Sequence, residues 1–279
     1  MSDDLGGGRD ETRRSVRFPA VAGVFYPSSP ARLRAMVQGA LAGAVRDAPD
    51  AVGERVPKAI IGPHAGYVYS GPIAASAYVW VRTSRGIVER VVLIGPAHWA
   101  ALNAVAVSSA NAFATPLGEL PVDADGRRSV LSCPGVVVDD RAHAKEHSLE
   151  VHLPFIQEVL GDVAVLPLVV GRMAATKVAD VLEAVWGGPE TLVVASTDLS
   201  HYHDHATAII LDRETAEAIV SRHPEEVGLD RACGVFAVRG LLEAARRHDL
   251  EVDLVDLRTS GDTSGSEESV VGYGAFVLS

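Results

Sequence analysis

The chain has 279 residues, 48% of them hydrophobic, and a formal net charge of −11 at neutral pH. This acidic balance argues against a nucleic-acid-binding surface, because phosphate contacts need clustered Lys and Arg. No apolar run approaches the roughly 20 residues that cross a bilayer, so we expect no membrane association. The two cysteines make no disulfide framework, and the N-terminus lacks the apolar core of a signal peptide, so we expect a cytoplasmic protein.

The order of the predicted elements indicates an α/β protein. Residues 1–15 are polar and glycine-rich and are expected to form a disordered leader before one domain over residues 16–279. Strand-like runs (KAIIG, RVVLIG, AVAVSS, VAVLPLVVG, TLVVAS, VDLVDLRTS, VVGYGAFVLS) alternate with helical patterns at about 31–46, 72–82, 142–160, 174–186, 206–221 and 235–247. Within 142–160, Pro154 is expected to mark a break or to start a second helix. This alternation predicts a single doubly wound α/β domain with a mostly parallel central sheet. The proline within VAVLPLVVG predicts an edge strand or an irregularity there.

Three histidine-bearing signatures follow three of the apolar runs. KAII leads into GPHAGY with His64, RVVLI leads into GPAH with His98, and TLVVAS leads into TDLSHY with Asp198 and His201. Ligands bind beyond the carboxyl ends of the strands in open α/β sheets, so these side chains are expected to meet at one edge. Histidine is the commonest metal ligand among side chains. The pattern therefore favours a mononuclear metal pocket.

Each of these residues also has a plainer interpretation. A single histidine is as often a hydrogen-bonding residue of a loop or core as it is a metal ligand. The Gly-Pro before both His64 and His98 makes the purely structural role less favoured for these two residues. Cys233 in ACG is by itself usually a small buried hydrophobic residue. Asp198 is adequately explained as a helix N-cap, and it can equally orient His201 for acid–base chemistry.

The segment AHAKEHSLEVH, residues 142–152, is dense in possible ligands. On a helix, His143 and His147 would share one face and Glu146 and Glu150 another. The order of residues differs from the HExxH zinc motif. For Glu146 and His147, packing or support of the ligands around a metal is at least as plausible as direct ligation.

Seven collinear signatures resemble the Memo family, called AmmeMemoRadiSam system protein B in prokaryotes. They are RFPAVAGVFYP, PHAGYVYSG, GPAH, TPLGELPVD, AHAKEHSLEVHLPFIQ, STDLSHY and ACG, and the chain ends in SVVGYGAFVLS. The resemblance implies a fold similar to the class III extradiol dioxygenases, which are non-haem iron enzymes. It implies His64, His98 and Cys233 as metal ligands, where those enzymes have two histidines and a glutamate.

The resemblance also implies roles for the residues around the metal. His201 matches the acid–base histidine with Asp198 beside it, and Phe25 and Tyr69 match aromatic residues of the pocket. A thiolate in place of a carboxylate favours copper(I) or zinc over iron as the metal.

Three functions stay open from the sequence. The first is a metal-dependent, dioxygenase-like oxidoreductase acting on a small molecule. The second is a non-catalytic protein that holds copper or iron. The third is a module that binds a peptide or a partner, with AMMECR1-like and radical SAM proteins as the partners that the resemblance implies.

Overall fold

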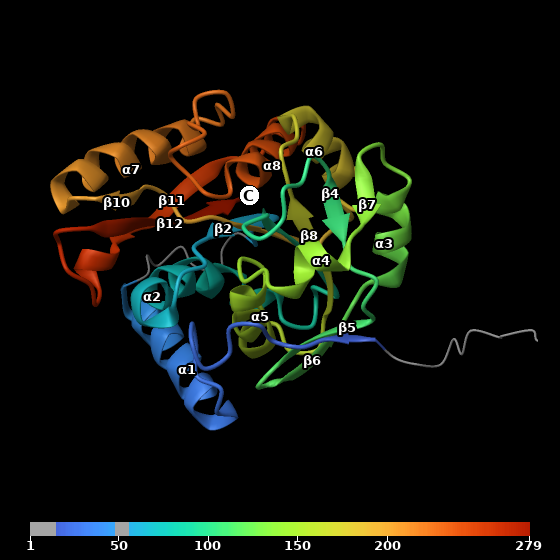
Figure 1. Ribbon diagram of the computed structural model, residues 1–279, viewed down its shortest axis with the longest axis horizontal. Helices are drawn as coiled ribbons and strands as arrows, with labels where there is room; N and C mark the ends of the chain where they lie inside the picture. Colours follow the sequence, from blue (N-terminus) through green and yellow to red (C-terminus); the bar gives the residue numbers. More distant parts are fainter. Residues whose placement is uncertain (1–14, 48–55) are drawn as a thin grey trace, which may run out of the picture.

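A nine-stranded sheet runs through the centre of the described chain in this computed structural model, which covers residues 15–47 and 56–279 (Figure 1). Its strands are β2 (Ala59–Gly62), β3 (Arg90–Pro96), β4 (Val105–Val107), β7 (Val136–Val138), β8 (Ala164–Val170), β9 (Thr191–Ser196), β10 (His201–His203), β11 (Val252–Thr259) and β12 (Val270–Leu278). The strand order is β10-β12-β2-β9-β3-β8-β4-β7, with β11 paired to β12. The expected leader lies outside the described residues except for its last residue.

The middle of the sheet is parallel and its flanks are mixed. Strands β2, β9, β3 and β8 run parallel to one another, while β12 joins β2, and β4 joins β8, in antiparallel fashion. The central strands are buried along their whole length, apart from the first residues of β3 and β8, as the β-branched runs predict. The carboxyl ends of three neighbouring strands, β2, β9 and β3, therefore meet at one edge.

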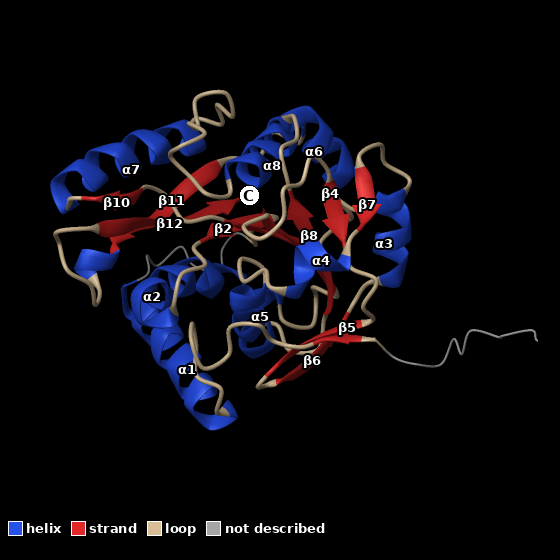
Figure 2. Cartoon of the chain, viewed as in Figure 1, coloured by secondary structure: helices blue, strands red, loops and turns tan. Residues whose placement is uncertain are grey.

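Helices cover both faces of the sheet (Figure 2). They are α1 (Pro30–Asp47), α2 (Tyr67–Tyr78), α3 (Ala124–Leu131), α4 (Asp140–Ala144), α5 (Leu153–Val159), α6 (Ala175–Glu183), α7 (His205–Val220) and α8 (Val235–Arg247). Alternate residues of each strand enter two cores: Leu93 packs with α1, α2 and α5, whereas Val92 packs with α6 and α8. This arrangement confirms the expected doubly wound α/β fold. A small sheet of β1 (Val16–Arg17), β5 (Ala112–Thr115) and β6 (Gly118–Pro121) lies beside it.

The proline in β8 lies where its strand has no second partner. Pro167 pairs with Leu93 of β3, but β4 pairs with β8 only from Leu168 onward. The missing amide of Pro167 therefore removes no bond to β4. The expectation of an edge strand was wrong for β8 as a whole, and the register with β3 runs through Pro167 without an irregularity, so that alternative was wrong as well. Among the described residues, no helix has the length and apolarity needed to cross a membrane.

The expected helix at 142–160 was also wrong in its middle. Helix α4 ends at Ala144, a 3-10 turn covers Glu150–His152, and α5 starts at Leu153. The Glu146 carboxylate accepts hydrogen bonds from the amides of His147 and Ser148. A side chain that binds nearby amides competes with helical bonding. The anticipated helical faces, pairing residues 143 with 147 and 146 with 150, therefore do not form.

Candidate metal centre

Strand ends place His64, His98 and Asp198 at the same edge of the sheet. Each residue stands two positions after the end of its strand, β2, β3 and β9 respectively. Because β9 lies between β2 and β3 and all three are parallel, their following loops converge. The imidazole rings of His64 and His98 lie 5.2 Å apart between centroids. His147 joins them from the loop after α4.

The three imidazoles form a group that could hold a metal ion. One ring nitrogen from each of His64, His98 and His147 lies within 4.8 Å of the others. The His147 ring stacks on His98 with centroids 4.6 Å apart, and it meets His64 edge-on at 5.5 Å. Burial, and then the neighbouring His98, lower the pKa of His147, so this ring is neutral and able to bind a metal near neutral pH.

A serine fixes which nitrogen of His64 carries the proton. Ser196 Oγ lies 2.6 Å from His64 Nδ1 and donates its own proton to the Ser148 carbonyl at 2.7 Å. A carbonyl oxygen can only accept, so the hydroxyl proton is committed there and His64 Nδ1 must be the donor to Ser196. His64 Nε2 then carries the lone pair. Burial, and then His98, hold the pKa of His64 well below its ordinary value.

A second buried histidine supports the same serine. His152 Nε2 lies 3.0 Å from Ser196 Oγ, and Tyr78 donates its hydroxyl to His152 Nδ1 at 3.0 Å. Both rings thus donate to one hydroxyl oxygen, which has two lone pairs for the purpose. Burial lowers the pKa of His152 to about 3, which keeps this ring neutral. The network reaches from the core to His64 through neutral groups alone.

A glutamate fixes His98 in a similar way. Glu146 Oε1 lies 2.8 Å from His98 Nδ1, and Glu146 Oε2 accepts from the His98 amide at 2.6 Å. Burial opposes the charge on Glu146, but the bond from His98 and the bonds from backbone amides outweigh it and lower its pKa to about 2. The carboxylate therefore stays ionised, and it leaves His98 Nε2 free for a metal.

Cys233 lies against this group from the loop before α8. Its Sγ is 3.2 Å from His64 Nε2 and accepts from the Asp198 amide at 3.2 Å. Burial, and then the Asp198 carboxylate, raise the pKa of the thiol, so it is protonated without a metal. A Cβ on Gly234 would lie 2.3 Å from the Ser196 carbonyl oxygen, so a glycine is needed for this close approach.

Asp198 binds the His64 loop rather than the His201 ring. One carboxylate oxygen accepts from the His64 amide at 2.7 Å, and burial raises the pKa of the carboxyl to about 7. His201 Nδ1 instead donates to the Leu199 carbonyl at 2.8 Å, which leaves Nε2 for proton exchange. Among the described residues no hydrogen bond joins the Asp198 and His201 side chains.

An aromatic cavity of about 490 Å³ lies beside the group and brings the remaining candidates together. Phe25, Tyr69, His147, Asp198 and His201 all line it. Phe25 also packs edge-on against the His147 ring at 4.8 Å. The loop at 265–269 adds Gly265, Ser266 and Ser269 to the lining.

Some members of the site had no signal in the sequence. Ser196 closes the apolar run of β9, and His152 lies in the segment 142–160 that we expected to be helical, with a break or a second helix at Pro154. Their contacts join residues 44 to 132 positions apart along the chain. The one available sign was the density of histidines and acids in residues 142–152. Within that segment the sequence singled out Glu146 and His147 as residues that support a metal site, but it did not indicate His152.

Known proteins resemble the chain over almost its whole length. The family described as Memo-like protein matches residues 17–277. MEMO1 family proteins of Methanopyrus kandleri and Methanothermobacter thermautotrophicus are 36% and 35% identical, covering 94% and 92% of this chain and 98% of each relative. An uncharacterized protein of Escherichia coli K12 has the same fold with a TM-score of 0.52 at 15% identity, covering 80% of this chain and 100% of that one. The chain therefore belongs to the Memo family.

Proposed function

We propose that this protein binds one transition-metal ion and uses it in redox chemistry on a small molecule. The observation that carries the proposal is the convergence of His64, His98 and His147, with the Nδ1 atoms of the first two committed to Ser196 and Glu146. Neutral imidazoles with oriented lone pairs are the form that binds metals. Iron or copper, with zinc as a further possibility, suits a site of imidazole and thiol donors.

The third ligand is either Cys233 or His147. Cys233 Sγ lies beside His64 Nε2, as the family resemblance implies for a thiolate ligand. His147 needs to lose no proton in order to bind, whereas the Cys233 thiol does. A bound iron or copper would supply one-electron and oxygen chemistry at this position.

The residues of the aromatic cavity would act on the substrate. Phe25 and Tyr69 offer ring faces against which a planar substrate can stack. His201, whose Nδ1 donates to a carbonyl, keeps Nε2 available to take or give a proton. Asp198 has a pKa of about 7, and it is a second group able to hold a proton near neutral pH.

A non-catalytic metal-holding protein is the second candidate, and the buried Cys233 thiol favours it. A thiol is oxidisable, so it is poorly suited to a site that activates oxygen. The retention of His201 at the cavity favours the enzyme, because storage needs no acid–base group. The cytoplasmic location stays a prediction from the cysteine content and the N-terminal sequence, and the AMMECR1-like and radical SAM partners stay predictions from the resemblance.

Metal titration tests the proposal. The protein is purified without oxygen and titrated with Fe(II), Cu(I) and Zn(II) against a competing chelator. We expect one equivalent to bind, and His64→Ala and His98→Ala to weaken that binding by at least about 100-fold, since each removes a ligand. His223→Ala, at an exposed histidine outside the site, is the matched control. Equal affinities for all four proteins would contradict the metal centre.

A further inference from the structure

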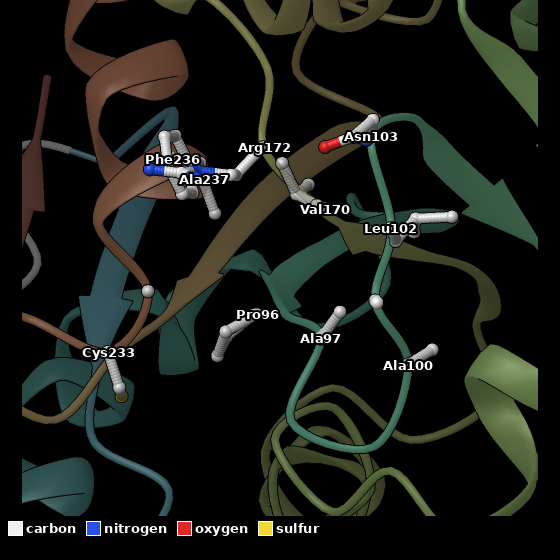
Figure 3. Close-up of a pocket in the computed structure, with 13 residues that line it drawn as sticks. Pro96, Ala97, Ala100, Leu102, Asn103, Val170, Arg172, Cys233, Phe236 and Ala237 are labelled. Atoms are coloured by element: carbon white, nitrogen blue, oxygen red, sulfur yellow. The ribbon is translucent and has the colours of Figure 1, made fainter. Parts of the chain in front are cut away.

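A second cavity, of about 400 Å³, opens on the Cys233 side of the candidate metal centre. Three segments form its wall: the end of β3 and its following loop from Pro96 to Asn103, the segment from Val170 at the end of β8 to Arg172, and the segment from Cys233 to Ala237 that leads into α8. Figure 3 shows these segments, with Arg172 near the top of the view and Cys233 near the lower left. The volume lies within the range of about 300–1,000 Å³ that small-ligand pockets have.

The lining of this cavity carries one charge, and that charge is positive. Arg172 is its only ionisable group apart from the Cys233 thiol, and no Asp or Glu lines it. In a chain of net charge −11, a cavity wall without a carboxylate stands out. The Arg172 guanidinium forms no ion pair or hydrogen bond with any described residue. Its five donors are thus free for a ligand.

The main chain of Arg172 is held in place, while its side chain is exposed and unpaired. The Arg172 amide donates to the Leu102 carbonyl at 2.8 Å, and a Cβ on the preceding Gly171 would lie 2.0 Å from that oxygen. Any side chain at position 171 would separate the loop at Leu102 from the segment that follows β8. The glycine therefore lets the loop after β3 close against β8, and this contact positions the arginine at the cavity.

The rest of the wall is mostly apolar and ends at the metal centre. Ala97, Ala100, Leu102, Val170 and Phe236 supply carbon surface, and Asn103 is a further polar side chain. At the other extreme, Cys233 Sγ contacts His64 Nε2. A molecule held here would have one end at a guanidinium and another close to the ligands of the metal.

We propose that this cavity binds a small organic acid with an apolar body, and that Arg172 pairs with its carboxylate. Guanidinium and carboxylate match in geometry and form two parallel hydrogen bonds, while the apolar wall accepts the carbon skeleton. The identification of this acid as the substrate rests on the function proposed above. The binding of the acid does not, because Arg172 and the apolar wall need no metal.

Ligand binding to the full chain tests this inference. The probes are acetate, phenylacetate and 3-phenylpropionate, each compared with its neutral amide by isothermal titration and ligand-observed NMR. We expect phenylacetate or phenylpropionate to bind at least about tenfold more tightly than the matching amide, because only the acid pairs with Arg172. Arg172→Gln should remove that preference, and Arg172→Lys should keep part of it.

Two further variants separate this cavity from other sites. Ala101→Trp, at an exposed position of the wall, should fill the space and weaken binding of the acid while the fold is kept. Arg32→Gln, at an exposed arginine on α1, is the control for a general loss of positive charge and should bind as the parent does. Saturable binding by none of the three acids, or equal binding by the parent and Arg172→Gln, would overturn the inference. Loss of binding in Tyr69→Ala alone would assign the acid to the aromatic cavity and would also overturn it.

Metal titration of the same proteins keeps the two proposals apart. Arg172→Gln should bind Zn(II) with the affinity of the parent, since Arg172 is not among the candidate ligands. A parent protein that binds the acids but no metal would refute the proposed function and leave this inference standing. A parent protein that binds metal but no acid would refute this inference and leave the proposed function standing.

Discussion

Replacing Glu146 by Gln is a sharp test of how the candidate centre is held together. The carboxylate receives four hydrogen bonds: from the ring and the amide of His98, and from the amides of His147 and Ser148. The side chain is 1% exposed, so water cannot substitute for a lost partner. In Glu146→Gln one of the two oxygens becomes an NH2 group, which must face at least one N–H donor. No rotation of the amide avoids this conflict.

The expected loss follows from that geometry. An unsatisfied buried donor costs about 1–3 kcal/mol, and the charge that draws the pKa of Glu146 to about 2 is also removed. We therefore expect unfolding to become easier by about 2–4 kcal/mol, or roughly 5–12 °C in Tm for a chain of this size. Metal affinity should fall by about 10–100-fold, because His98 loses the partner that orients its ring.

Thermal unfolding of the metal-free protein and a competition titration measure the two effects separately. Glu183→Gln is the control, since Glu183 has a partly exposed side chain and pairs with His248 on the surface. The reasoning is refuted if Glu146→Gln melts within 1 °C of the parent and keeps its metal affinity, a threshold set by the few degrees expected per kcal/mol. A loss of stability with unchanged metal affinity would show that Glu146 holds the loop but does not prepare His98.

Four further predictions address other parts of the site and the core. Ser196→Ala should cost about 1–3 kcal/mol and weaken metal binding, because the ring N–H of His64 loses its acceptor; chemical denaturation and metal titration measure this. Burial lowers the pKa of His143 to about 4, so as pH falls from about 6.5 to 4 this histidine becomes protonated in the unfolded chain but stays neutral in the folded one. The free energy of unfolding should therefore drop by up to about 3 kcal/mol over that pH range. Denaturation across this pH range should show a flatter profile for His143→Gln. Cys233→Ser should cut Cu(I) affinity by at least about tenfold more than Fe(II) affinity in competition titrations, since a hydroxyl is a hard ligand. His201→Ala should keep the metal stoichiometry of the parent by elemental analysis while abolishing any turnover that is found.

Strand ends were the part of the site that the sequence could indicate. His64, His98 and Asp198 each follow a short β-branched run, and the run, its Gly-Pro or Ser boundary and the polar residue after it are all local features. Such features predict which residues lie beyond a strand. They do not predict that β9 lies between β2 and β3, because the order of strands depends on contacts between distant segments.

The loop after α4 shows why local pattern was insufficient. The spacing of residues 142–160 is helical, but Glu146 takes up two backbone amides and the helix ends. The result places His147 on the candidate centre, and it sends Glu150 to a separate buried cluster with Arg17 and Tyr26. The pattern of apolar residues carries no information about this competition between a side chain and the helix.

The choice between Cys233 and His147 follows from the protonation of each group. The thiol must release a proton before it can bind, and burial beside Asp198 makes that release harder. The His147 ring is neutral already, because burial lowers its pKa. A soft ion such as Cu(I) recovers the cost of deprotonation through its strong bond to sulfur, whereas Fe(II) recovers less. Under the proposed function, the same fold would therefore present a thiolate set to a soft ion and an imidazole set to a harder one.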